Sequence, residues 1–173
     1  MRDQFFRLYI DIKVAERYYC RYTDRSVLWN NVITGFCLLT SAATICSWPI
    51  WSEAPIIWAI FLAGAQVLAV LRPLFKSAAR LSAAKYLLPE LSELIDNVTN
   101  TWHEIQYVRT FSDQEIYDMT RKYRAKFTAI CDRFASSELF PEKEKLHKAA
   151  QEDAKIYFSV QYNIPREAMS CEE

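Results

Sequence analysis

Two long, uncharged apolar stretches constrain this chain more than any other feature of its sequence. No Asp, Glu, Lys or Arg occurs from Ser26 to Ser52, and none occurs from Ile56 to Leu71. At about 1.5 Å per residue, helices over the expected spans 27–50 and 56–75 are long enough to cross a hydrocarbon core of about 30 Å. The short join Pro49–Pro55 contains two prolines and suits only a tight turn. The sequence therefore predicts a transmembrane helical hairpin.

Basic and aromatic residues predict the orientation of this hairpin. The join contains Glu53 and no Lys or Arg, whereas both flanks are basic, and basic flanks favour the cytoplasmic side. Trp29 at one end and Trp48 at the other lie at the two expected membrane boundaries, as in aromatic belts. A signal peptide is excluded, because a long charged segment precedes the first stretch and a second stretch follows it. We expect an integral membrane protein with both termini in the cytoplasm.

Composition excludes several functional classes. The chain has 21 basic and 21 acidic residues, so no overall positive charge suggests direct binding to nucleic acid. Its two glycines, Gly35 and Gly64, lie in the apolar stretches, so no glycine-rich phosphate loop can form. The cysteines form no CxxC pair, and His103 and His147 have no partner at ligand spacing. We expect no metal, no cofactor and no enzymatic activity.

Apolar residues continue at steps of three and four on the N-terminal side of the first stretch. Because neither Gly nor Pro interrupts them, the N-terminal segment and the first stretch are predicted to form one helix of about 45 residues. The aromatic side chains of this segment could instead anchor it in the membrane interface. The spaced series is Phe5, Leu8, Ile12, Ala15, Tyr19 and Tyr22, continued by Ser26, Trp29 and Ile33. The possible anchor is Phe5, Phe6, Tyr9, Tyr18, Tyr19 and Tyr22.

The same spacing follows the second stretch. Pro73 and Pro89 should bend this helix without necessarily ending it. Ser112 and Glu115 form a capping-box pattern that begins another helix. Pro141 suits the first turn of the last helix, which Asn163 should end. The expected apolar faces are Leu81, Ala84, Leu88, Leu91, Ile95, Val98, Trp102 and Ile105, then Ile116, Met119, Tyr123, Phe127, Ile130 and Phe134, and finally Leu146, Ala150, Tyr157 and Val160.

These patterns predict an all-α protein, with long helices that extend from a two-span hairpin into a cytoplasmic antiparallel bundle. Some of these faces could also pair between subunits. The expected segments are a cytoplasmic amphipathic helix (1–26), the first span (27–50), an external turn (51–55), the second span (56–75), the bundle (76–163) and a tail (164–173).

The first span carries a polar stripe at steps of four and three. Polar side chains in a bilayer turn toward other helices or toward water. If several copies surround an axis, the stripe can line a narrow aqueous pore. Alternatively, it serves close helix packing, with hydroxyls bonded to the carbonyl four residues earlier. The pore-lining candidates are Asn30, Thr34, Cys37, Ser41 and Thr44, together with Gln66 of the second span.

Small residues in the spans predict close helix contacts, because they let backbones approach. The candidates for helix packing are Gly35, Ala59, Ala63 and Gly64. Arg72 and Pro73 mark the cytoplasmic boundary as a hinge or interface. Arg72 either extends to lipid phosphates or takes part in a gate. We expect the partners to be the lipid bilayer and further copies of the chain.

The layout resembles the SLATT group of small bacterial membrane proteins over about residues 5–110. The residues that carry the resemblance are Arg17, Arg21, Trp29, Gln66 and Trp102. It implies an oligomeric effector of the bacterial inner membrane that forms pores or disrupts the membrane when a separate sensor or signalling protein activates it, in abortive infection against phage. The alternative is a membrane-anchored coiled-coil scaffold that recruits a soluble partner and forms no pore.

Overall fold

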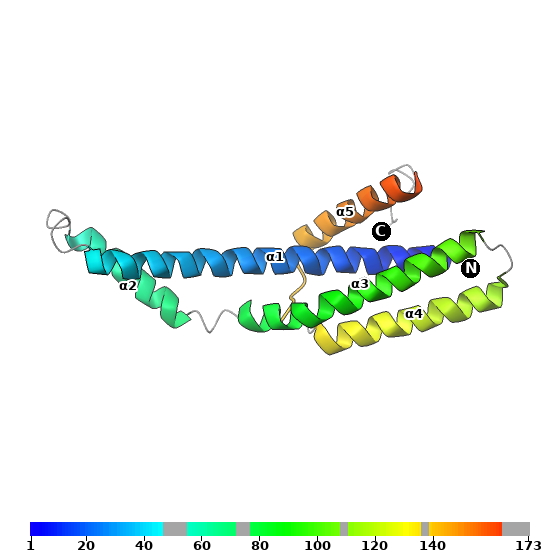
Figure 1. The fold of residues 1–173 in the computed structure, drawn as a ribbon, viewed down its shortest axis with the longest axis horizontal. Helices are drawn as coiled ribbons and strands as arrows, with labels where there is room; N and C mark the ends of the chain where they lie inside the picture. Colours follow the sequence, from blue (N-terminus) through cyan, green and yellow to red (C-terminus); the bar gives the residue numbers. More distant parts are fainter. Residues whose placement is uncertain (47–54, 72–76, 108–110, 136–138, 164–173) are drawn as a thin grey trace. The chain divides into compact units, whose positions relative to one another are not determined.

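A computed structural model describes residues 1–46, 55–71, 77–107, 111–135 and 139–163. The described secondary structure consists of five helices, with no strand in these ranges: α1 (Arg2–Cys46), α2 (Pro55–Leu71), α3 (Ser77–Tyr107), α4 (Asp113–Phe134) and α5 (Glu144–Tyr162) (Figure 1). The predicted all-α class is confirmed. The predicted turn at 51–55 and the tail at 164–173 lie almost wholly outside the described residues, as does Pro73.

α1 is 45 residues long and has no break, as the unbroken apolar spacing predicts. Two compact units divide the chain. We call residues 1–23 and 82–173 the bundle unit, and residues 24–81 the apolar unit. No helix in the described part of the chain combines the length and apolarity that crossing a membrane requires. The two-span hairpin therefore stays a prediction.

The helices of the bundle unit pack antiparallel, as predicted, and their contacts define the register. Along α1, Tyr9 hydrogen bonds Thr99 of α3 at 2.8 Å, whereas Tyr22, further along, shares a cluster with Leu87. α5 also runs against α1, because Tyr9 packs on Phe158 (ring centroids 4.9 Å apart) and Tyr18 contacts His147.

α4 follows α3 in the opposite direction. Tyr123 Oη hydrogen bonds Thr101 Oγ1 at 2.8 Å, and Arg133 approaches Glu90 near the other end of the pair at 3.8 Å. Pro89 lies inside α3 on its exposed side, so it does not end the helix, as predicted.

The core of the bundle unit consists of two clusters, each of which combines aromatic and aliphatic side chains. Phe5 stacks on Trp102 with the two rings 9° from parallel, and Val98 and Ile105 are completely buried beside them. Lys13 is also buried; its ammonium group pairs with Glu16 at 2.6 Å and lies over the Tyr157 ring. Within the bundle unit, most positions of the α1 and α3 series are buried, which confirms the predicted faces there. Further along α1, Trp29 of the same series is 58% exposed.

The aromatic residues of α1 belong to this core. Phe5 and Tyr9 are fully buried, and Tyr18 and Tyr22 are nearly so. The alternative in which this series anchors the chain in a membrane interface is therefore wrong. The physical reason is that α3 and α5 already cover these rings from both sides.

The helix ends agree with the sequence in two places and differ in a third. Ser112 caps α4 in a capping box with Glu115, and Asn163 ends α5 in the left-handed conformation at φ 52°. Pro141, however, precedes α5 rather than lying in its first turn. The hydroxyl of Tyr18 donates to the Pro141 carbonyl and accepts from the amide of Lys143, which ties this segment to α1 in a non-helical form.

The predicted apolar face of α5 is wrong at its C-terminal end. Val160 is 79% exposed, whereas Phe158 is completely buried in the core. The buried positions of α5 are Ala150, Ala154 and Phe158, at steps of four. A row of residues at steps of four follows the helix surface at an angle, and it brings Phe158 into contact with Tyr9. The predicted series, which continues through Tyr157 and Val160, does not include Phe158.

Candidate functional site

The polar stripe of α1 occupies the less exposed side of this helix in the apolar unit. Asn30, Thr34 and Cys37 are half-buried, whereas Leu28, Val32 and Leu39 on the opposite side are exposed. The hydroxyl of Thr34 donates to the carbonyl of Asn30 at 2.7 Å. This is the backbone bond expected of a hydroxyl inside an apolar helix, so Thr34 needs no water.

For two of the stripe candidates, the structure describes the backbone and not the side chain. Ser41 and Thr44 lie within α1, but their side chains are outside the described part of the structure. Arg72 and Pro73 lie outside the described residues altogether. The stripe is therefore described over Asn30, Thr34 and Cys37 only.

α2 presents its small residues and several large apolar side chains on one face. Ala65 is buried and Leu68 is half-buried, and every other described residue of this helix is exposed. Ala59, Ala63, Gly64 and Gln66 belong to this exposed face, together with Ile56, Ile60, Val67 and Val70. Gln66 therefore lies away from the half-buried side, where its side chain is accessible to another molecule.

Both glycines have open space around them in the single chain. A Cβ atom added at Gly35 or at Gly64 would meet no atom within 4 Å. Among the described residues, neither glycine is thus required for packing within one copy of the chain. If Gly64 serves close helix approach, as its small neighbours predict, the approaching helix comes from a second copy or another protein.

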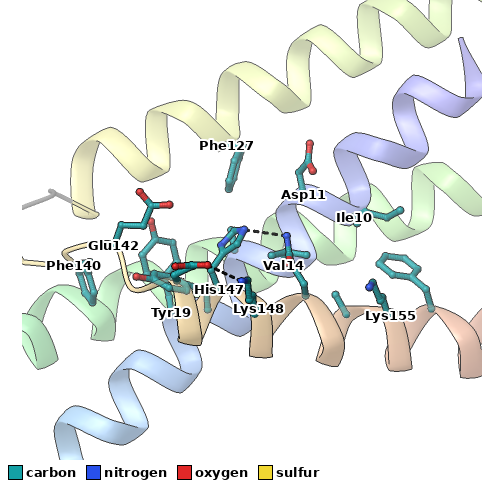
Figure 2. A pocket seen from close by; sticks show the side chains of 16 residues that line it. Ile10, Asp11, Val14, Tyr19, Phe127, Phe140, Glu142, His147, Lys148 and Lys155 are labelled. Carbon is teal, nitrogen blue, oxygen red and sulfur yellow. Dashed lines mark hydrogen bonds and ion pairs between the residues drawn. The ribbon is translucent and has the colours of Figure 1, made fainter. Parts of the chain in front are cut away.

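A pocket in the bundle unit was not foreseen from the sequence. It has a volume of about 660 Å³ and lies between α1 and α5, closed by Phe127 of α4 and Phe140 of the segment before α5 (Figure 2). Its lining comes from parts of the chain far apart in sequence, so no local motif marks it. The only hint in the sequence is the aromatic content of α1, whose spacing predicts helix packing or a membrane anchor and not a pocket.

Burial in this region raises the pKa values of three ionisable groups. Loss of solvent raises the pKa of Tyr19 to about 12 and raises the pKa of Tyr18 above its ordinary value. Desolvation also raises the pKa of the Asp11 carboxyl, and the charges of Arg124 and Arg7 partly oppose this rise. The two tyrosines stay neutral at physiological pH and act as hydrogen-bonding and packing groups.

Comparisons with known proteins give no relative for this arrangement. No protein family, no curated protein and no solved structure matches the chain. The likeness to SLATT proteins thus stays a resemblance of layout.

Proposed function

We propose that this chain is an integral membrane protein whose apolar unit lies in the bilayer, self-associates there, and permeabilises the membrane when activated. The observation that carries this proposal is the exposure of large apolar side chains on both helices of the apolar unit. Leu39 of α1 is 71% exposed, and Ile56 and Val70 of α2 are 74% and 72% exposed. Exposed apolar surface of this kind marks contact with a membrane or another protein.

Lipid fits this surface better than a soluble partner does. Protein interfaces combine an apolar centre with a polar rim. Here the surrounding sequence supplies no charged rim, because Ser26–Ser52 and Ile56–Leu71 contain no Asp, Glu, Lys or Arg. Charged residues begin again on the cytoplasmic side of the proposed spans, at Arg25 and Arg72.

Self-association is supported by the exposed face of α2. Ala59, Ala63 and Gly64 lie on it without a partner in the single chain, and small residues at these steps let helices approach closely in lipid. Gln66 on the same face can hydrogen bond to its own copy, which compensates a polar side chain near the middle of the bilayer.

Permeabilisation requires the polar stripe to change its surroundings. Asn30 and Thr34 are on the half-buried side of α1 in the single chain. We propose that assembly and activation move this side of α1 toward an axis, where the stripe lines water. In this proposal the bundle unit lies in the cytoplasm of a bacterial cell and receives the activating signal from a separate protein.

A second candidate function is favoured by the internal hydrogen bond of Thr34. Because this hydroxyl is satisfied by Asn30 within its own helix, the stripe can serve packing alone. The chain would then be a membrane-anchored scaffold, and the bundle unit would recruit a soluble partner.

Reconstitution separates these two functions. We would place the full chain in phosphatidylethanolamine and phosphatidylglycerol vesicles that contain a dye, and measure flotation for insertion and dye release for permeabilisation. Overexpression in bacterial cells with an external DNA dye tests the same property in a native membrane. Asn30→Leu should abolish release and leave flotation intact. Val32→Leu, on the exposed side of α1, is the matched control and should release dye like the wild type.

The outcomes are distinct. Flotation without dye release or dye entry would favour the scaffold. Failure to float after alkaline extraction would contradict membrane insertion and hence both candidates. The defence role implied by the SLATT resemblance is tested by phage plating on cells that carry the chain with its neighbouring genes, and again with Asn30→Leu in place of the wild type.

A further inference from the structure

We propose that the pocket between α1 and α5 binds a small hydrophobic ammonium compound, in which an aromatic or branched aliphatic group carries a protonated amine. This inference concerns the bundle unit and does not depend on the proposed membrane function. It would add a small-molecule site to a chain that has no recognisable ligand-binding motif.

The floor of the pocket is apolar and aromatic. Phe158 and Ala154 are fully buried beneath it, Phe140 is nearly so, and the Phe127 ring of α4 points toward the cavity from the other side (Figure 2). A volume of about 660 Å³ lies within the range of sites for small organic ligands. Aromatic faces attract cations as well as apolar groups, because their ring faces are electron-rich.

The charges of the rim decide the sign of the ligand. Lys148 pairs with Glu144 at 2.6 Å, and Lys155 pairs with Glu152 at 3.1 Å, so both lysine charges are compensated. His147 shares a hydrogen bond with Gln151 at 3.2 Å.

The two remaining rim carboxylates, Asp11 and Glu142, make no ion pair in the described part of the chain. In Figure 2 they lie on either side of His147. Arg7 and Arg124 act on Asp11 only over a distance. Among the lining residues, three carboxylates (Asp11, Glu142 and Glu144) face two lysines (Lys148 and Lys155), so the net charge of the lining is negative, which favours a cation.

Both sides of the opening are held in place. The two hydrogen bonds of the Tyr18 hydroxyl, each 3.2 Å long, flank Glu142 and fix its backbone on α1. α5 is held to α1 by Arg21, whose Nε and Nη2 donate to the Asp153 carboxylate at 2.5 and 2.8 Å. A site that is already ordered loses less entropy when a ligand binds, so a small amine can bind without rearranging the bundle.

A matched ligand series tests this proposal on the full chain in detergent or lipid nanodiscs. The probes are 3-phenylpropylammonium, 3-phenylpropanol and 3-phenylpropanoate, which share one apolar group and differ in charge. Isothermal titration calorimetry should give the ammonium compound an affinity about tenfold or more above that of the alcohol, since charge-assisted contacts are stronger than neutral ones. The carboxylate compound should bind more weakly than the alcohol.

Variants locate the binding site. Asp11→Asn with Glu142→Gln should remove the preference for the ammonium compound and leave the affinity for the alcohol unchanged. Asp118→Asn, an exposed carboxylate of α4 outside the pocket lining, is the control and should bind like the wild type. Ala15→Phe, which fills the pocket from its half-buried lining position, should weaken all three probes.

Three results would overturn the proposal. The first is tighter binding of the carboxylate compound, which would assign the specificity to Lys148 and Lys155. The second is equal affinity for all three probes, and the third is no binding of the ammonium compound at millimolar concentration. Membrane insertion is measured separately by flotation, so the failure of one proposal does not affect the test of the other.

Discussion

The bundle unit and the apolar unit share the same helical periodicity, but the bundle unit buries its large apolar side chains whereas the apolar unit exposes them. In the bundle unit, large residues such as Phe5, Ile12 and Leu91 have no exposed area or almost none. In the apolar unit, Ala65 is the one buried residue among those described, and side chains as large as Trp29 are more than half exposed.

This difference shows that periodicity identifies a face and leaves its partner undetermined. α1 runs through both units with an unbroken apolar spacing. Where charged residues occupy the other side of the helix, as in the bundle unit, the apolar face packs on other helices of the same chain. Where no charged residues occur, apolar side chains cover most of the helix surface, and one neighbouring helix cannot cover them all. Four experiments test this contrast, from the largest expected effect to the smallest.

The largest effect should come from placing two lysines on the exposed face of α2. If this face contacts lipid, Ile60→Lys with Val67→Lys should disfavour insertion by about 5–7 kcal/mol, at about 2.5–3.5 kcal/mol per lysine. The alkali-resistant, floating fraction should fall almost to zero. The matched control places lysines at Ile156 and Val160, which are exposed apolar positions of α5. Equal flotation of both double variants would remove the contrast between the units.

The next effect concerns the core of the bundle unit. Phe158→Ala should lower the free energy of unfolding by about 3–5 kcal/mol, because a buried ring is removed from its contacts with Tyr9 and Phe6. Val160→Ala, two positions away and 79% exposed, should change it by less than about 0.5 kcal/mol. Urea unfolding followed by hydrogen exchange of α3, α4 and α5 measures both. Similar losses for the two variants would contradict the observed core.

A smaller effect should distinguish the two glycines. Gly64→Leu should weaken self-association in mild detergent at least about tenfold, equal to about 1.4 kcal/mol, if the small face of α2 forms the contact. Gly35→Leu tests the other glycine, which also has open space around it in the single chain, and association should persist. Sedimentation over a dilution series measures the difference. Unchanged association of Gly64→Leu would exclude this face from the oligomer contact.

The smallest effect is a pH dependence confined to the bundle unit. Hydrogen bonds from Arg21 lower the pKa of Asp153 below its ordinary value of 3.8. The pair therefore contributes its full stability above that value, and the contribution is lost as the pH falls further through the pKa of the folded state. At pH 7, Asp153→Asn should cost less than about 1 kcal/mol, because both side chains are partly exposed.

Urea midpoints measured at pH 7 and at pH 3 check this sign. The difference between the wild type and Asp153→Asn should shrink at pH 3, and high salt should reduce it at pH 7. A difference that grows on acidification would contradict the role of this pair.

The helices were largely predictable because local chemistry determines where they begin and continue. The reciprocal bonds of Ser112 and Glu115 need only neighbouring residues, and the continuity of α1 needs only the absence of Gly and Pro. The buried faces of α1 and α3 followed from their spacing for the same reason. In α5, the series could not distinguish Phe158 from Val160, because the choice depends on where Tyr9 and Phe6 lie in another helix.

The sites were less predictable than the fold. The small residues of α2 were recognised, but whether they face their own chain or the outside depends on how α2 packs. The pocket was missed because Asp11, Phe127 and Glu142 come from three separate segments. The start of α5 was placed too early because a hydroxyl of α1, that of Tyr18, holds Pro141 and Lys143. Each of these features is a tertiary contact that no single segment encodes.

Pro89 gives α3 a point of lower bending stiffness, and the other described helices of the bundle unit contain no proline. Its ring nitrogen carries no hydrogen, so the hydrogen-bond ladder lacks a link one turn earlier, at the carbonyl of Lys85. Such a helix bends more easily at that point than elsewhere along its length. The stacked rings at Trp102 lie 13 residues further along the helix. A load on α3 should therefore bend the helix at Pro89 before it displaces these rings.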